Sequence, residues 1–271
     1  MHVPRKRFGQ HFLHDPRVIQ RIVDSIAPAA DDLMLEIGPG LGALTRPLLD
    51  RLTHLHALEI DRDAIRHLQQ QFESTRLTLH EGDALQFDLA TLARGPASVR
   101  VVGNLPYNIS TPLLFHLLET REWIRDMHFM LQKEVVDRMA AGANDEAYGR
   151  LSVMLAPWVR VEPLFDIGPG AFRPPPKVMS TVVRLVPHDA LPLARQYPQA
   201  FAQIVAAAFS QRRKTLRNSL RALLSDEEIA STQVDPGARP EVLSPLQFSL
   251  LAECLGTKPP RSTEPAPELE R

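Results

Sequence analysis

The amino-acid sequence predicts an α/β protein with a mostly parallel, doubly wound sheet and a small all-helical C-terminal domain. Three observations lead to this prediction. From Asp31 onward, apolar segments with strand character alternate with segments of helical periodicity, which is typical of parallel sheets. A glycine-rich turn follows the first of these strands. After Pro187 the strand-like segments end, and helical patterns follow one another.

The expected strands and helices of the sheet alternate in a regular order. The strands cover residues 33–38, 54–60, 77–84, 99–105 and 127–132. The helices that connect or follow them cover residues 44–52, 62–72, 111–119 and 133–140. Two later strand-like segments, 161–168 and 180–187, have no long helix between them. We therefore expect these two segments to form an antiparallel hairpin at one edge of the sheet.

The residues after Pro187 are expected to fold separately. Helical segments cover residues 201–224, 225–232 and 244–255, and the last two begin at serines that suit N-caps. The end of the chain has little apolar content, so we expect it to be disordered. We predict a first domain over residues 1–190, a helical domain over 191–261 and a tail over 262–271.

The composition is that of an ordinary soluble globular protein: 271 residues, 44% hydrophobic and 23% charged, with a formal net charge of −1. The single cysteine, Cys254, excludes an intramolecular disulfide, and the 10 histidines show no metal-binding spacing. No apolar run reaches membrane-spanning length, and the apolar part of the N-terminus is too short for a signal peptide. We expect a cytoplasmic protein without a metal, and a monomer, because no spare apolar patch is evident.

The turn after the first strand, "LEIGPGLGALT", indicates a ligand site. Gly38, Gly40 and Gly42 lie in this turn, where glycine allows a close approach of the backbone and leaves free amides at the helix start. These glycines alone do not identify a ligand site, because a tight strand-to-helix turn that binds no ligand can have the same sequence pattern. The turn also satisfies a lenient dinucleotide-binding pattern, with Ala43 in the last place.

Two acidic residues at the next strand ends strengthen the case. Glu59 ends the second strand, where a carboxylate can accept both hydroxyls of a ribose. Asp83 ends the third strand and could accept the exocyclic amine of an adenine. A surface glutamate and a turn-capping aspartate are the alternatives. Because three strand ends meet at one edge of a parallel sheet, we predict a site for an adenosine-containing cofactor, either NAD or S-adenosyl-L-methionine.

The fourth strand end decides between these cofactors. There "GNLPY" places Asn104, Leu105, Pro106 and Tyr107. The side-chain oxygen of Asn104 and the carbonyl of Leu105 could accept the hydrogens of a ring-conjugated amine and localise its lone pair. Pro106 fixes the turn, and Tyr107 offers a flat face on which a base can stack. Hydride transfer gains nothing from such a group, whereas methyl transfer to a base amine does, so S-adenosyl-L-methionine is favoured.

This stretch resembles the N/D-P-P-Y-type motif of adenine-N6 methyltransferases. The resemblance continues through "RKRFGQHFL", "EIGPGLGALT", "HFMLQKEV", "YGRLSV", "FRPPPKV" and "FSQRRKTLRNSL", from the N-terminus to about residue 220. The chain is similar to the family of small-subunit (16S) rRNA adenine N6,N6-dimethyltransferases. The resemblance implies a Rossmann-like class I methyltransferase fold, S-adenosyl-L-methionine as cofactor, and dimethylation of two adjacent adenosines near the 3′ end of 16S rRNA.

The resemblance also implies roles for individual residues. The cofactor contacts it implies are His11, Leu13, Gly38, Gly40, Glu59, Asp83 and Asn104. His11 departs from the family, which has asparagine there; histidine can also donate a hydrogen bond, but its reach and protonation differ. Phe172 is expected to form a second wall opposite Tyr107 for the flipped base, and the alternative is a core phenylalanine. The prolines at 174–176 would stiffen this loop.

Two basic clusters are expected to bind RNA. The first is Arg5, Lys6 and Arg7. The second contains Arg212, Arg213, Lys214, Arg217 and Arg221, with no acid among them. On a continuous helix, residues 213, 217 and 221 would share one face and could follow a phosphate backbone. The alternative is a solvated helix face, which more often mixes charges of both signs.

Three other functions stay open at this point. A 23S rRNA adenine methyltransferase of the macrolide-resistance type would share the fold and the cofactor. An RNA-binding assembly factor could retain the fold while methyl transfer is secondary or lost. An NAD-dependent oxidoreductase is the third alternative, and the "NLPY" turn disfavours it.

Overall fold

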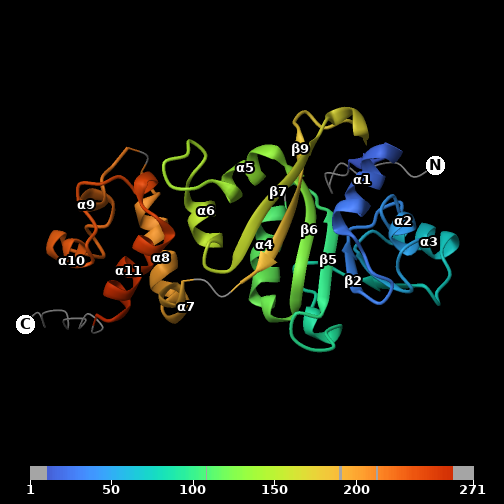
Figure 1. The fold of residues 1–271 in the computed structure, drawn as a ribbon, viewed down its shortest axis with the longest axis horizontal. Helices are drawn as coiled ribbons and strands as arrows, with labels where there is room; N and C mark the ends of the chain where they lie inside the picture. The colour runs from blue at the N-terminus through green and yellow to red at the C-terminus, as the bar shows by residue number, and fades with distance from the viewer. Residues whose placement is uncertain (1–10, 108, 189–190, 212, 259–271) are drawn as a thin grey trace, which may run out of the picture. The chain divides into compact units, whose positions relative to one another are not determined.

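The computed structural model describes residues 11–107, 109–188, 191–211 and 213–258 (Figure 1). The chain divides into two compact units. The first unit holds the residues up to 141 together with 158–190, and the second holds 142–157 together with the residues from 191 onward.

The first unit contains a seven-stranded sheet in the order β4-β3-β2-β5-β6-β9-β7. Its strands are β2 (Leu33–Ile37), β3 (Leu55–Glu59), β4 (Leu77–Glu81), β5 (Val99–Asn104), β6 (Ile124–Gln132), β7 (Val159–Ile167) and β9 (Ser180–Pro187). The strands from β4 to β6 are parallel, while β9 is antiparallel to both β6 and β7. The predicted sheet is confirmed, including the antiparallel pair at one edge.

The helices that the structure describes in the first unit accompany this sheet. They are α1 (Pro16–Ile26), α2 (Thr45–Leu49), α3 (Arg62–Gln71), α4 (Ser110–Glu119) and α5 (Lys133–Ala140), with 3-10 turns at Leu89–Thr91, Arg121–Trp123 and Pro169–Ala171. Every residue of β2 is buried, as expected for a central strand. Helix α1 was not predicted from the sequence, because it lies before the first predicted strand, at residues 33–38. Its N-cap is Asp15, whose side chain accepts hydrogen bonds from the backbone N–H groups of Arg17 and Val18.

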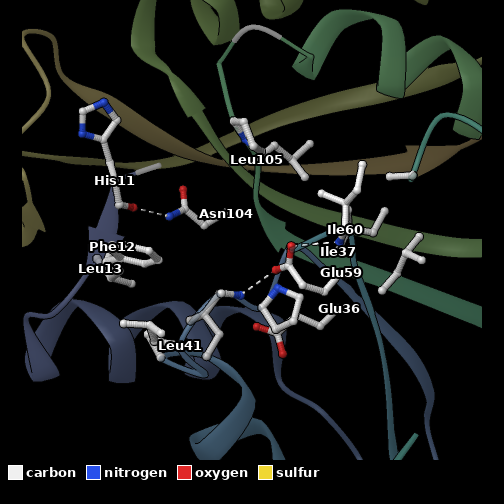
Figure 2. A pocket seen from close by; sticks show the side chains of 18 of the residues that line it. His11, Phe12, Leu13, Glu36, Ile37, Leu41, Glu59, Ile60, Asn104 and Leu105 are labelled. Atoms are coloured by element: carbon white, nitrogen blue, oxygen red, sulfur yellow. Dashed lines mark hydrogen bonds between the residues drawn. The ribbon is translucent and has the colours of Figure 1, made fainter. Parts of the chain in front are cut away.

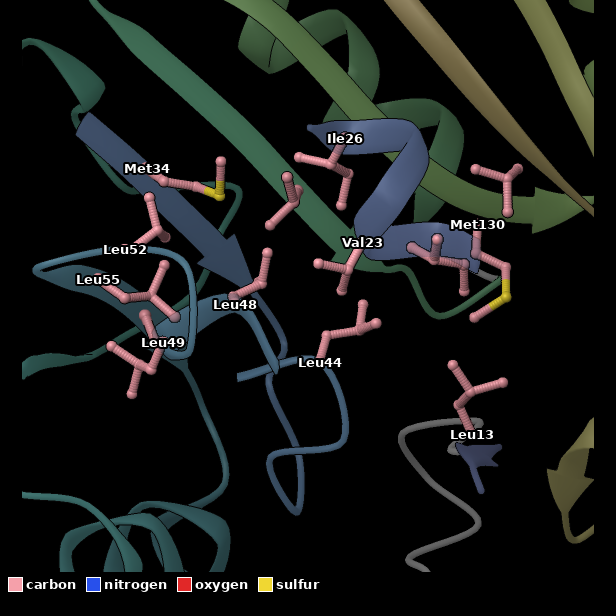
Figure 3. Close-up of a cluster of buried hydrophobic side chains, with 14 of the residues drawn as sticks. Leu13, Val23, Ile26, Met34, Leu44, Leu48, Leu49, Leu52, Leu55 and Met130 are labelled. Carbon is pink, nitrogen blue, oxygen red and sulfur yellow. The ribbon is translucent and has the colours of Figure 1, made fainter. Parts of the chain in front are cut away.

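A second, two-stranded sheet joins distant parts of this unit. Strand β1 (Phe12–Leu13) pairs antiparallel with β8 (Phe172–Arg173), so that Leu13 lies opposite Phe172. Both of these side chains belong to the buried cluster that α1, α2 and β2 also supply. Figure 3 labels Leu13 among the residues of this cluster. Residues 11–13, called the N-terminal segment below, are therefore fixed by a backbone ladder and by apolar burial together.

The second unit is helical. Its helices are α6 (Arg150–Leu155), α7 (Pro192–Gln196), α8 (Pro198–Ala208), α9 (Leu216–Ser219), α10 (Asp226–Ser231) and α11 (Pro245–Gly256), with a 3-10 turn at Pro240–Val242. Helices α10 and α11 begin at Ser225 and Ser244, each with a reciprocal capping box. None of the helices in the described part of the chain could cross a membrane.

Residues 142–157 were assigned to the first domain in the sequence analysis, but they cluster with the helical unit. Two hydrogen bonds connect them to its far end. The Asn144 N–H donates to the Glu241 carbonyl over 2.9 Å, and the Tyr148 hydroxyl donates to the Leu243 carbonyl over 2.8 Å. The tail over 262–271 lies outside the described residues.

The prediction of one continuous helix over 201–224 is wrong. Helix α8 ends at Ala208, and the next helix, α9, has only four residues. Arg213, between them, has a φ of 78°, which no right-handed helix allows. The N–H groups of Leu216 and Arg217 donate to the carbonyls of Ala238 and Pro236. The chain breaks its helix here because its backbone bonds to a distant segment.

Candidate active site

A cavity of about 690 Å³ lies where the parallel strands β2, β3 and β5 end (Figure 2). The loop after β4, the N-terminal segment and the loop after β8 complete its lining. Ten predicted site residues line it: His11, Leu13, Gly38, Gly40, Glu59, Asp83, Asn104, Leu105, Pro106 and Tyr107. Its volume falls in the range of pockets that hold a small molecule. The structure therefore brings together the strand ends that the sequence predicted to meet.

The glycine-rich turn provides a cradle at the end of β2. Gly38, Gly40 and Gly42 have φ values of 67°, 56° and 85°, in the region that favours glycine. A Cβ atom at Gly38 would meet nothing within 4 Å, whereas one at Gly40 would lie 3.1 Å from the Phe12 ring. The open space above Gly38 is suited to a ligand that approaches the backbone closely.

The Glu59 carboxylate lies at the end of β3, almost wholly buried. It accepts hydrogen bonds from the backbone N–H groups of Gly40 (3.1 Å), Ile60 (2.9 Å) and Asp61 (2.9 Å). Burial raises the pKa of Glu59, and these three donors act in the opposite direction. Since a carboxylate can accept about four hydrogen bonds, it retains capacity for a further donor such as a ribose hydroxyl.

Asp83 serves the turn after β4 and also faces the cavity. One of its oxygens accepts the backbone N–H of Leu85 over 3.0 Å. The capping role that the sequence analysis gave as the alternative is thus present. The same carboxylate lines the cavity, so the two roles are compatible.

Asn104, at the end of β5, is fixed by the N-terminal segment. Its side-chain nitrogen donates a hydrogen bond of 3.0 Å to the backbone carbonyl of His11 (Figure 2). This contact uses the donor end of the amide and leaves the oxygen as its acceptor end. Leu105, the next residue, is buried and holds the turn to the core.

Tyr107 is held at both ends. Its hydroxyl lies 2.8 Å from the Ser180 hydroxyl, and its carbonyl accepts a hydrogen bond of 3.1 Å from the Ser110 hydroxyl. Burial raises the pKa of the Tyr107 phenol, while the Ser180 contact acts in the opposite direction. The His11 imidazole stacks against the Tyr107 ring, with centroids 5.7 Å apart and planes at 29°.

The His11 side chain is bound to the proline-rich loop. Its Nδ1 lies 2.7 Å from the Pro174 carbonyl, which makes Nδ1 the donor. His11 thus links three parts of the site: the Asn104 amide, the Tyr107 ring and the loop after β8. The family resemblance implied only a cofactor contact for this residue.

Phe172 does not line the cavity, which contradicts its expected place opposite Tyr107. Its side chain is only 1% exposed and belongs to the main apolar cluster. The pairing of Phe172 with Leu13 in the β1–β8 ladder places both side chains in this cluster. The alternative that the sequence analysis gave, a core phenylalanine, is the observed one.

Glu36, in the buried strand β2, lines the cavity and was not predicted. The Thr45 hydroxyl donates to its carboxylate over 2.7 Å. Burial raises the pKa of Glu36 to about 7, with a further contribution from the nearby Glu59. The signal in the sequence was a charged residue inside the apolar run "LMLEIG".

Those predicted RNA-binding cations that the structure describes do not line this cavity. Arg5, Lys6, Arg7 and Arg212 lie outside the described residues. Arg213, Lys214, Arg217 and Arg221 belong to the helical unit. They do not share a helix face, because α9 covers only residues 216–219. The Arg217 guanidinium is paired with the Asp226 carboxylate over 2.5 Å.

Within the described ranges, no group of three His, Cys, Asp or Glu side chains is placed to hold a metal ion. The cavity instead presents three carboxyl side chains and a glycine cradle on one side, and an oriented amide beside an aromatic ring on the other. The carboxyl groups can accept hydrogen bonds from the sugar hydroxyls of a nucleoside. The amide oxygen can accept a hydrogen bond from an exocyclic amine of a base that stacks on the aromatic ring.

A family model described as ribosomal RNA adenine dimethylase matches residues 1–256. The chain is 55% identical over 258 residues to the ribosomal RNA small subunit methyltransferase A of Thiobacillus denitrificans, covering 95% of this chain and 100% of that protein. It is 58% identical over 244 residues to the protein of the same name from Methylococcus capsulatus, covering 90% and 94%.

Solved structures are similar as well. A dimethyladenosine transferase from Plasmodium falciparum has a TM-score of 0.72 at 25% identity, covering 89% of this chain and 96% of that chain. The 23S rRNA methyltransferase ErmE has a TM-score of 0.69 at 25% identity, covering 90% and 99%. These matches extend over almost the whole chain.

Proposed function

The chain belongs to the ribosomal RNA adenine dimethylase family, and from this premise we propose that its cavity dimethylates N6 of two adjacent adenosines near the 3′ end of 16S rRNA. The protein is an S-adenosyl-L-methionine-dependent rRNA adenine dimethyltransferase that acts in small-subunit biogenesis. The observation that carries the proposed site is the hydrogen bond from the Asn104 amide to the His11 carbonyl, because it leaves an acceptor for an amine.

The residues around the glycine turn fit the cofactor. The open space above Gly38 and the remaining acceptor capacity of Glu59 suit the backbone and ribose contacts of an adenosine. Asp83 would accept the adenine amine of the cofactor. When bound, S-adenosyl-L-methionine supplies an electrophilic methyl group on a sulfonium.

The substrate adenine would be held at the end of β5. The Asn104 side-chain oxygen and the Leu105 carbonyl accept the two N6 hydrogens and localise the nitrogen lone pair. Tyr107 stacks on the flipped base through the ring face turned away from His11. A sulfonium leaving group needs no general acid and the methylated amine loses its proton readily, so positioning and electrostatics supply the catalysis.

The RNA would extend from this pocket to basic side chains. Among the described cations of the second cluster, Arg213, Lys214 and Arg221 have no ion pair to another described residue, and they are our candidates for phosphate contacts. We place the enzyme in the cytoplasm as a monomer, where its substrate is the small ribosomal subunit or its precursor.

The structural similarity to a 23S rRNA methyltransferase makes 23S rRNA the second candidate substrate. The small-subunit substrate is favoured, because relatives with that name are 54–58% identical to this chain. The 23S enzyme is 25% identical.

Labelled S-adenosyl-L-methionine and under-methylated ribosomal subunits test this proposal. Small subunits should yield N6,N6-dimethyladenosine at two adjacent positions, while large subunits treated in parallel should stay unlabelled. Label in 23S adenine would identify the resistance-type activity. Binding to small subunits without any label would indicate an assembly factor.

A further inference from the structure

We propose that Ser180 is a positioning residue for methyl transfer, because its hydroxyl holds the Tyr107 ring in the orientation on which the target adenine stacks. The two hydroxyl oxygens lie 2.8 Å apart and come from positions 73 residues apart in the chain. This inference rests on the proposed function, since it assigns a role to a contact beside the same pocket.

Ser180 is a rigid anchor. It is the first residue of β9, lies opposite Gln132 of β6 and Ile167 of β7, and is 0% exposed. A residue paired on both sides within a sheet has little freedom to move. Its hydroxyl therefore gives Tyr107 a hydrogen-bond partner that is fixed in the same sheet as β5.

The strand does not need this hydroxyl for its own pairing. Backbone groups make the ladder with β6 and β7, so an alanine could replace Ser180 while the strand keeps its pairing. Among the described residues, the hydrogen-bond partner of the Ser180 side chain is Tyr107. A buried hydroxyl requires a hydrogen-bond partner. Here the partner is the hydroxyl of Tyr107, which belongs to the proposed catalytic turn, residues 104–107.

Tyr107 needs an anchor of this kind. Its backbone is held by the Ser110 hydroxyl and by the turn in which the Ile109 N–H donates to the Pro106 carbonyl. These contacts do not fix the torsions of the side chain. The bond to Ser180 holds the far end of the ring, and the His11 imidazole covers one of its faces. The opposite face is then presented to a base in one orientation.

The neighbouring Thr181 supplies a matched control. It is also buried in β9, but its side chain points to the other face of the sheet, where its hydroxyl donates to Asp166 over 2.6 Å. Removal of either hydroxyl costs one partly buried hydrogen bond that a buried residue of the same strand makes. Of these two hydroxyls, only that of Ser180 contacts the proposed catalytic turn.

The test compares Ser180→Ala, Tyr107→Phe, the double variant and Thr181→Val. The readout is the single-turnover rate of methyl transfer to under-methylated small subunits, with cofactor affinity, KM for subunits and thermal midpoint measured beside it. Ser180→Ala and Tyr107→Phe should each slow transfer about 10-fold, and the double variant should be no slower than either. Cofactor affinity and KM should stay within about 2-fold, as expected for misplacement of a bound base.

Thr181→Val should lower the thermal midpoint about as much as Ser180→Ala does, yet transfer at the wild-type rate. A wild-type rate in Ser180→Ala, multiplicative losses in the double variant, or an equal slowing by Thr181→Val would each overturn the role of Ser180. A wild-type enzyme that leaves adenine N6 unmodified would overturn the proposed function first, and this role with it.

Discussion

The side-chain nitrogen of Asn104 donates a hydrogen bond of 3.0 Å to the backbone carbonyl of His11, which lies 93 residues earlier in the chain. An asparagine amide can turn either its oxygen or its nitrogen toward a ligand, and this contact decides which. Because the nitrogen is engaged, the oxygen is the end available to accept the hydrogens of a substrate amine. The N-terminal segment thus sets the polarity of the site at the end of β5.

Glu36→Gln should change the pH dependence of stability. Burial raises the pKa of Glu36 in the folded state to about 7 from an ordinary 4.5. Between these values the unfolded chain loses a proton that the folded protein retains, so the unfolding free energy falls as the pH rises. The variant has no carboxyl group at this position, so its unfolding free energy does not fall in this way. It should be more stable than the wild type by about 3 kcal/mol at pH 8, with no difference near pH 4.5.

Urea unfolding at both pH values measures this difference, with Glu253→Gln in α11 as the control. If Glu36→Gln differed from the wild type by the same amount at pH 4.5 and pH 8, the carboxyl would not be protonated in the folded state at neutral pH.

His11→Asn should bind S-adenosyl-L-methionine at least as tightly as the wild type at neutral pH. An amide can replace the imidazole as a donor toward Pro174, and the carbonyl that accepts from Asn104 belongs to the backbone. Calorimetry measures the affinity, with His67→Asn in α3 as a control outside the cavity. A clear loss of affinity in His11→Asn alone would show that the imidazole has a role of its own in cofactor binding.

Charge reversal in the second basic cluster should weaken RNA binding unequally. Arg213→Glu and Lys214→Glu should each lower the slope of log affinity against log salt by about 0.7–0.9 for every phosphate that the variant no longer neutralises. Arg217→Glu should have a smaller effect, because Arg217 already pairs with Asp226. Filter binding to 16S rRNA over a salt series measures these slopes, with Arg51→Glu as an exposed control in the first unit. Unchanged slopes would assign this segment to packing.

Arg100→Met should destabilise the fold by about 3–5 kcal/mol without touching the pocket. The Arg100 guanidinium is buried between Asp32 (2.7 Å) and Asp126 (2.9 Å). Its removal leaves the buried Asp126 carboxylate with only the more distant Arg184 (3.4 Å), and leaves Asp32 with the exposed Arg125. Arg125→Met is the matched control, since Arg125 also pairs with Asp32 but is 56% exposed. Its removal should cost less than about 1 kcal/mol. Equal effects in chemical unfolding would contradict this account of the buried network.

The sheet and the gathering of Gly38, Glu59 and Asp83 around one cavity could be predicted because their signals are local. Apolar runs such as "LMLEIG" mark central strands, and parallel strands bring their carboxyl ends together wherever the chain connects them through helices. Helix α1 was missed although it also carries a local signal, with apolar residues at 18, 19, 22, 23 and 26 after the Asp15 cap.

The proposed substrate side of the pocket could not be predicted in the same way. The contacts of Asn104 with His11 and of Tyr107 with Ser180 join segments 93 and 73 residues apart, and no local pattern encodes them. Phe172 is buried because β8 pairs with β1, which is again a long-range event. The break between α8 and α9 contains neither glycine nor proline and depends on bonds to residues 236–238.

The most direct test of the central claim is the single-turnover rate of methyl transfer by Asn104→Ala, at saturating cofactor and under-methylated small subunits. Without the oriented acceptor, transfer should slow by about 100- to 1,000-fold, or about 3 kcal/mol, while the thermal midpoint and RNA affinity stay near the wild type. Asn218→Ala, an exposed asparagine in α9, should transfer at the wild-type rate. A rate for Asn104→Ala within about 2-fold of the wild type would contradict the proposal that this amide holds the adenine amine for methylation.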